Sequence, residues 1–226
     1  MTRPSIAATI REISEVTEFL VVKGMVDDQN FPYRADRADG ITEIRYPGAL
    51  GADVTLREHP YSQTYGEHLA ARAFNFRLLD GALVQMSYTF TDGDLTGGRL
   101  AFLPSPDLSE YQNDPEIYEQ DMMFAEAVDR RVVTVPIRFD FDSRADVVVD
   151  VHHPKSHLTV GQYRNCRIAA TSALTPGVFV EFILRSFYNT AAREHTAGLP
   201  LRGHRFDATI TTAEAQQVHI GIPAGA

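Results

Sequence analysis

Apolar side chains recur with the spacing of an α-helix in two parts of the chain. In Ser5–Gly24 they recur every three or four residues, which predicts an amphipathic helix that ends at the glycine. A second helix is predicted over Thr175–Thr190, where the apolar stripe places Phe182 and Ile183 in the core. Asp114-Pro115 combines a capping residue with a proline in the first turn, so it predicts the start of a third helix.

Alternating apolar and polar positions predict several antiparallel strands. In Ala73–Phe90 two apolar runs flank Asp80-Gly81, which is a strong hairpin signal. A further turn over Asp92–Gly98 leads into Arg99–Leu103, so that three strands form a meander. Gln85, in the middle strand, is interpreted as a solvated sheet residue rather than part of a cleft. The other predicted strands are Ile41–Tyr46, Val132–Phe141, Val147–His152, Cys166–Ala170 and Arg205–Thr211.

The order of these elements predicts an α+β fold. We expect a mainly antiparallel sheet built from hairpins, with about three helices packed on one face. No internal repeat or low-complexity linker interrupts the chain, so residues 1–226 are expected to form a single domain. The chain lacks the glycine-rich motifs that join a strand to a helix in dinucleotide-binding and P-loop folds, which disfavours both classes.

Composition narrows the class of protein further. Of the 226 residues 44% are hydrophobic and 23% are charged, values that are ordinary for a globular protein. No segment approaches the roughly 20 apolar residues that span a bilayer, and the N-terminus has no signal-peptide core. The single cysteine excludes an internal disulfide. These features predict a soluble cytoplasmic protein that has no membrane partner.

Charge is distributed unevenly along the chain. The net charge of −9 disfavours a protein whose whole surface binds nucleic acid. Residues 1–150 hold 14 basic and 26 acidic side chains, whereas residues 151–226 hold 7 basic and 4 acidic ones. Six of the eight histidines also lie in the second part. A site for an anionic ligand is therefore expected in the last third of the chain.

Polar side chains alternate with apolar ones in the predicted hairpin of Val132–Phe141 and Val147–His152. A five-residue loop would place Asp140 opposite Asp150, where two carboxylates repel unless a cation or a proton lies between them. A three-residue loop would instead pair Arg138 with Asp150 in an exposed salt bridge. Both registers remain open. Either one places four polar side chains on one face of the hairpin: Arg138, Asp140, Asp150 and His152.

A cluster of histidines follows this predicted hairpin. The run HHPKSHLT, residues 152–159, holds three imidazoles, one lysine and two hydroxyls. Imidazole is the natural acid or base near neutral pH, and Lys155, Arg164 and Arg167 have the chemistry to hold phosphate oxygens. The alternative is a surface turn whose histidines cap strands and bond to backbone carbonyls.

Five sequence runs resemble an uncharacterised bacterial family, a domain of unknown function of similar length. These runs are DGALVQMSY, RLAFLPSP, PIRFDFD, HPKSHLTVGQYRNCRI and FVEFILRSFYNT. The resemblance extends over about residues 74–191, and its most specific parts are Phe139–Asp142 and His153–Arg167. The family has no established reaction. The resemblance implies a single compact unit and an association with bacterial mobile and defence loci.

The first functional hypothesis is an enzyme that cleaves phosphoesters, as an effector directed at RNA or nucleotides. His153 and His157 would act as acid and base, with His152 beside them, and Asp140 and Asp150 would orient a histidine or bind a divalent metal ion. The side chains expected to bind the substrate are those of Arg138, Lys155, Thr159 and Arg164.

The second hypothesis is a non-catalytic subunit of a multi-protein bacterial system of the defence type, which would have a protein partner. The two hypotheses differ in geometry. An enzyme requires that the histidines and aspartates converge on a concave pocket, whereas an interaction surface would spread them over a flat face.

The cluster also yields a prediction for His157. His157→Ala should abolish activity and leave the folding midpoint nearly unchanged, because an exposed turn histidine adds little to stability. An activity assay run beside a urea melt of the same variant measures both quantities. Loss of stability with full activity would contradict the assignment, and so would full activity with normal stability.

Overall fold

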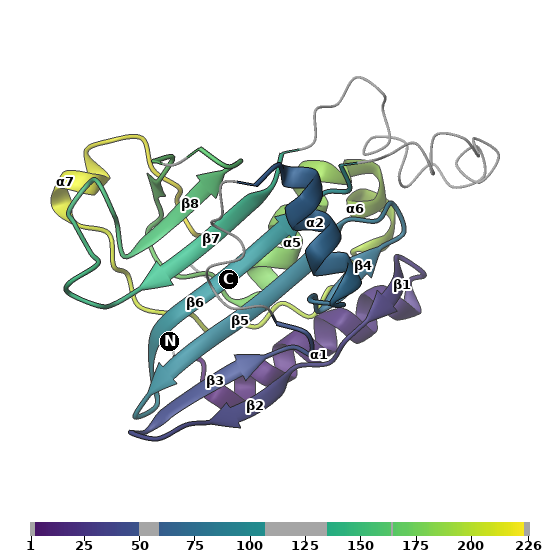
Figure 1. Ribbon diagram of the computed structural model, residues 1–226, viewed down its shortest axis with the longest axis horizontal. Coiled ribbons are helices and arrows are strands. Elements are labelled where there is room, and N and C mark those ends of the chain that lie inside the picture. Colours follow the sequence, from purple (N-terminus) through teal and green to yellow (C-terminus); the bar gives the residue numbers. More distant parts are fainter. Residues whose placement is uncertain (1–2, 50–58, 107–134, 164, 224–226) are drawn as a thin grey trace.

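A single antiparallel sheet forms the centre of the protein. The computed structural model describes residues 3–49, 59–106, 135–163 and 165–223. Within these ranges nine strands join one sheet (Figure 1). The predicted α+β fold is confirmed. The strands are β1 Val26–Gln29, β2 Tyr33–Asp36, β3 Ile41–Arg45, β4 Phe76–Leu78, β5 Leu83–Thr91, β6 Asp94–Leu103, β7 Ile137–Asp142, β8 Ser156–Val160 and β9 Ile168–Ala169.

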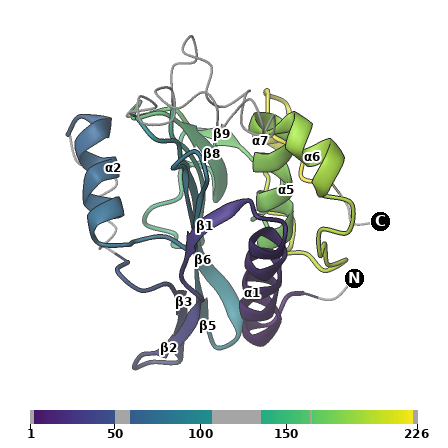
Figure 2. The same cartoon turned by 90° about the vertical axis from the view of Figure 1, so that its right-hand side faces the viewer.

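Helices cover both faces of the sheet, so the expectation that they pack on one face is wrong. Figure 2 shows α1, α5 and α6 on one face and α2 on the other. The two longest follow the sequence prediction: α1 starts after Ser5, whose hydroxyl accepts a hydrogen bond from the Ala8 N–H, and α5 starts after Thr175. The helix predicted at Asp114 lies outside the described residues. The described helices are α1 Ile6–Val22, α2 Tyr61–Ala70, α5 Pro176–Phe187, α6 Asn189–His195 and α7 Thr212–Ala215.

The predicted meander forms the middle of the sheet. The turn at Asp80-Gly81 joins β4 to β5, and the turn at Asp92-Gly93, where both residues have positive φ, joins β5 to β6. β6 therefore begins earlier than expected. β5 pairs with β6 along one edge. Along its other edge, β4 pairs with the first residues of β5 and β3 pairs with the last ones.

The predicted hairpin of Val132–Phe141 with Val147–His152 is wrong. β7 pairs with β6 on one side and with β8 on the other. The valine run forms turns instead, in which Val149 is exposed and Val151 has a φ of 67°, a value that interrupts a strand. Leu158 in β8 supplies the buried residue that the valines do not. Two other strands also differ: β9 is shorter than expected, and Arg205–Thr211 forms only an isolated bridge at Ala208.

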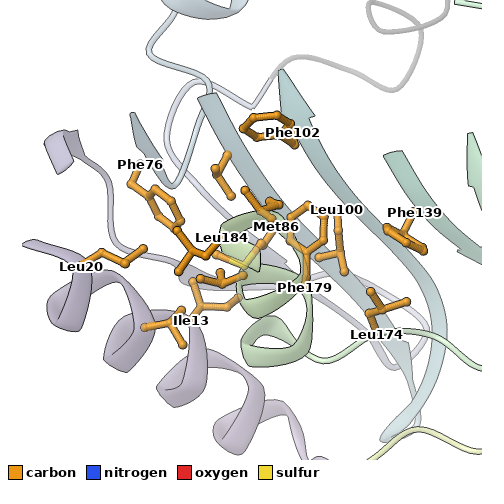
Figure 3. Packing of buried hydrophobic residues seen from close by; sticks show 14 of the residues in the cluster. Ile13, Leu20, Phe76, Met86, Leu100, Phe102, Phe139, Leu174, Phe179 and Leu184 are labelled. Carbon is orange, nitrogen blue, oxygen red and sulfur yellow. The ribbon is translucent and has the colours of Figure 1, made fainter. Parts of the chain in front are cut away.

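The main core lies between the sheet and the helices α1 and α5. Because strand side chains alternate between the faces, Met86, Leu100 and Phe139 all point toward these helices (Figure 3). They pack against apolar residues such as Ile13 and Phe179. This burial of apolar surface is the main driving force for folding.

A smaller cluster lies on the opposite face, beneath α2. It consists of Tyr65, Phe74, Leu83, Ala101 and Leu103. The side chains that follow on the same face of β5, β6 and β7 are polar, among them Ser87, Arg99 and Asp140. α2 therefore covers the apolar end of this face.

Two phenylalanines of α5 allow a matched test of the main core. Phe179 is fully buried, whereas Phe182 is half-buried and makes edge contacts with Phe139 and Phe187. Phe179→Ala should lower the free energy of unfolding by about 3–5 kcal/mol, and Phe182→Ala should lower it less. Urea denaturation with an unchanged slope measures both values. A larger loss for Phe182→Ala would contradict this arrangement of the core.

Candidate functional site

One polar row crosses the face of the sheet that carries α2. Ser87 in β5 lies opposite Arg99 in β6, Arg99 opposite Asp140 in β7, and Asp140 opposite His157 in β8. Directly opposed residues of antiparallel strands project from the same face. The pairing of four strands therefore brings together residues that are up to 70 positions apart in the sequence.

Asp140 is held between two arginines. Arg99 Nε lies 3.0 Å from its Oδ1, and Arg138 Nε lies 2.5 Å from its Oδ2. The Asp140 side chain is only 12% exposed. Burial alone would raise the pKa of Asp140, but the charges of Arg138 and Arg99 lower it below its ordinary value. Asp140 is therefore an ionised carboxylate at neutral pH.

His157 lies in β8 and is buried, so the expectation that it is an exposed turn residue is wrong. Its Nδ1 is 2.8 Å from the Pro154 carbonyl oxygen, which can only accept a hydrogen bond, so Nδ1 carries a proton. Its Nε2 faces Asp140, 3.7 Å from Oδ2. Burial lowers the pKa of His157, and Asp140 opposes this only in part. The imidazole is therefore neutral at neutral pH, with a lone pair on Nε2.

His153 lies beside His157 and is held in the same way. Its Nδ1 is 2.6 Å from the Val147 carbonyl oxygen, and the centres of the two imidazole rings are 5.1 Å apart. The contact to the carbonyl fixes the proton on Nδ1 and leaves Nε2 available to a ligand. His153 is half-buried, so it is the more accessible of the two.

These residues line a cleft of about 660 Å³, a size that suits a small organic ligand or part of a larger one. Its charged side chains include six arginines and three carboxylates, an excess of positive charge in a chain with a net charge of −9. A concave site with an excess of one sign of charge attracts ligands of the opposite sign. The charged residues are Arg37, Arg45, Arg99, Arg138, Arg144, Arg167, Glu43, Asp140 and Asp142.

The structure brings together four of the nine candidate site residues. Arg138, Asp140, His153 and His157 line the cleft. Both predicted registers of the hairpin are wrong, since the residue opposite Asp140 is His157.

Four of the other five candidates are described, and none of these four lines the cleft. Asp150 is exposed and accepts a hydrogen bond of 2.6 Å from the Thr211 hydroxyl. His152 and Lys155 are exposed as well. Thr159 is opposite Arg138 in the sheet but is not part of the cleft wall. Arg164 lies outside the described residues.

Several cleft residues were not predicted from the sequence. Gln85 is buried rather than solvated, and its amide donates hydrogen bonds to the Ala73 carbonyl and to His68 Nδ1. Arg99 and Arg45 belong to strands that were predicted correctly, and the alternation of side chains places both on the polar face. The missing information was which strand pairs with which.

Two further structural properties bear on the site. Across the described ranges, no group of three or more His, Cys, Asp or Glu side chains is arranged to hold a metal ion. None of the helices found there is long and apolar enough to cross a membrane.

Residues 25–222 match the model of a protein family described as "Uncharacterized conserved protein (DUF2290)". The chain belongs to this family. The resemblance to an uncharacterised family seen in the sequence is thereby confirmed. No curated protein matches the chain, and no solved structure does. All the cleft residues named above lie within the family region, whereas α1 precedes it.

The buried state of His157 predicts a dependence of stability on pH. Because its pKa in the folded protein is lower than in the unfolded chain, the unfolded chain binds a proton first as the pH falls below 6.5. His157 therefore loses part of its contribution to stability at low pH. The free energy of unfolding lost in His157→Gln should be larger at pH 7.5 than at pH 5.

Urea melts of the wild type and the variant at both pH values measure this difference. Other titrating groups are common to the two proteins, so their effects cancel. Arg185→Gln, an exposed change on α5, serves as a control whose stability difference should not depend on pH in this range. A loss for His157→Gln that stays constant or grows as the pH falls would contradict the buried, neutral imidazole.

Proposed function

We propose that the cleft binds a phosphate-bearing ligand and cleaves a phosphoester bond in it, as an effector directed at RNA or nucleotides. The observation that carries this proposal is the gathering of arginines around the Asp140–His157 row in an otherwise acidic protein. The planar guanidinium of arginine matches the geometry of phosphate oxygens and donates two parallel hydrogen bonds.

Two arginines near the histidines have donors for such a ligand. Arg138 contacts Asp140 through Nε and lines the cleft. Arg167 lines the same cleft and has no hydrogen-bonding or ionic partner in the described part of the chain. Its charge nevertheless lowers the pKa of His157, so the guanidinium lies near that imidazole.

The two histidines line the cleft side by side, so that one can act as the base and the other as the acid. His157 has a lowered pKa and a free lone pair on Nε2, so it suits the base. It takes a proton from the attacking hydroxyl or water as that oxygen bonds to phosphorus. The bond from phosphorus to the leaving oxygen breaks, and protonated His153 gives its Nε2 proton to that oxygen. The negative charge of Asp140, 3.7 Å from Nε2, stabilises the imidazolium formed at His157.

His153→Gln tests the catalytic part of this proposal. The variant should cleave a fluorescein-labelled hexauridylate about 10²–10⁴-fold more slowly, because the leaving ribose oxygen then receives no proton. It should bind the same RNA as tightly as the wild type does. Gel analysis of the cleavage and fluorescence anisotropy of the binding measure the two effects.

A second substrate separates the acid from the base. Bis(p-nitrophenyl) phosphate has a leaving group that needs no proton, so His153→Gln should hydrolyse it at nearly the wild-type rate. Equal losses on both substrates would contradict the acid role of His153. RNA that binds the wild type without being cleaved would overturn the catalytic part, which is the behaviour expected of a non-catalytic subunit.

A further inference from the structure

One buried histidine of the cleft has a ring nitrogen without a partner. His68 lies on α2, is only 3% exposed and lines the cleft. Its Nε2 atom is buried and has no hydrogen-bond partner in the described part of the chain. Native proteins leave few buried polar groups unpaired, because such a group has given up its hydrogen bonds to water. The unpaired nitrogen therefore points to a group that a ligand supplies.

The contacts of Gln85 determine the chemical character of this nitrogen. Gln85 Nε2 is 2.6 Å from the Ala73 carbonyl oxygen, which can only accept, so this atom is the amide nitrogen. The same amide donates to His68 Nδ1 over 3.0 Å, so Nδ1 holds the lone pair of the ring. Burial lowers the pKa of His68, so the ring is neutral at neutral pH. Its single proton is therefore on Nε2, which is a hydrogen-bond donor.

This donor lies at some distance from the phosphate-binding arginines. Gln85 in β5 is opposite Ala101 in β6, and Ala101 is opposite Arg138 in β7. Neighbouring strands are about 4.8 Å apart, so two steps separate Gln85 from Arg138 by about 10 Å. His68 contacts Gln85 from α2, which covers this face of the sheet (Figure 2). A ligand that reaches both His68 and Arg138 must therefore extend beyond its phosphate group.

The side chains at His68 suit an uncharged polar group. A neutral N–H donor pairs well with a carbonyl oxygen or a ring nitrogen, whereas phosphate oxygens form stronger bonds with the cationic donors of the cleft. Gln85 adds an acceptor, because its Oε1 makes no hydrogen bond in the described part of the chain. A donor beside an acceptor matches the edge of a nucleobase, where acceptors and N–H groups are neighbours.

We propose that His68 and Gln85 bind the base of a nucleotide whose phosphate lies at Arg138 and Arg167. This inference rests on the proposed function and specifies how its ligand is recognised. The ribose of a nucleotide separates the base from the phosphate, so one ligand reaches both groups of residues. An acceptor on the base takes the hydrogen bond from His68 Nε2, and an N–H of the base donates to Gln85 Oε1. Shielding from water strengthens both hydrogen bonds.

Two small ligands separate the contribution of the base from that of the phosphate. Uridine 5′-monophosphate carries a base, a ribose and a phosphate, whereas ribose 5-phosphate lacks the base. Neither has a phosphodiester bond to cleave. Isothermal titration calorimetry with the wild-type protein measures both affinities. Uridine monophosphate should bind at least about tenfold more tightly, because it gains the hydrogen bonds at His68 and Gln85.

His68→Phe removes the donor and keeps an aromatic ring in its place. The variant should bind uridine monophosphate about tenfold more weakly than the wild type does, and ribose 5-phosphate with unchanged affinity. Gln63→Ala, an exposed change on the same helix, is the matched control and should alter neither affinity. Circular dichroism establishes that both variants are folded.

NMR spectroscopy of the wild type provides a test that does not depend on the folding of a variant. In protein labelled with ¹⁵N-histidine, the Nε2 proton of His68 is assigned through bonds from its own backbone. Uridine monophosphate should move this resonance downfield, because the proton then joins a hydrogen bond. Ribose 5-phosphate should leave the resonance unchanged.

The outcomes distinguish this inference from the proposed function. If both ligands bind with equal affinity and the His68 resonance does not move, the base site is wrong and the phosphate site stands. An equal loss of both affinities in His68→Phe also overturns the base site, since it indicates a structural role for the ring. If neither ligand binds the wild type, both the inference and the proposed function fail.

Discussion

A buried carboxylate between two arginines is the interaction on which the polar face depends. Asp140 requires cations because it lies largely out of water, and it takes them from its own strand and from β6. The arginines require Asp140 in turn, because two guanidinium ions so close together would otherwise repel each other. Replacing both partners of such a pair can be tolerated, but removing one leaves an uncompensated charge. The triad therefore holds the cationic side chains in fixed positions.

The same strand connects this triad to the core. Between Arg138 and Asp140 lies Phe139, whose ring meets Phe179 and Phe182 of α5 edge-on. A shift of one residue would turn Phe139 toward the cleft and Asp140 toward the helices. The packing of α5 therefore fixes the direction of the charged groups on the other side. The alternation of side chains along β7 therefore determines both the packing of the core and the geometry of the site. The central residues of the cleft are positioned by strands rather than by loops.

The alternation of side chains in β7 was predicted correctly from the sequence, but the strands that pair with β7 were not. The pattern of β7 alone placed Arg138 and Asp140 on one face, and the structure confirms it. The predicted partner strand was wrong because the valines before Asp150 have the composition of a strand, whereas β8 directly follows His153, Pro154 and Lys155, a polar run with a proline that is typical of a turn. Composition did not indicate which segment pairs with β7, because Val151 adopts a positive φ and the buried residue beside Phe139 is Leu158.

Pairing between distant segments explains the other misses. Arg99 lies 41 residues before Asp140, and no local pattern in the sequence indicates that β6 is the neighbour of β7. The burial of His157 has the same origin, because it results from the strands on either side of β8. By contrast, α1, α5 and the hairpin at Asp80-Gly81 are specified by local signals, and these were predicted. The signals are the cap of α1, the proline and the apolar stripe of α5, and the turn of the hairpin.

The most direct test of the account is the position of a bound phosphate analogue. Tungstate has the tetrahedral shape and double charge of phosphate, and its anomalous scattering locates it in a crystal without ambiguity. The account predicts a tungstate ion in the cleft, in contact with the guanidinium of Arg167 or Arg138. Tungstate bound only outside the cleft, or a cleft filled by another segment of the chain, would contradict it.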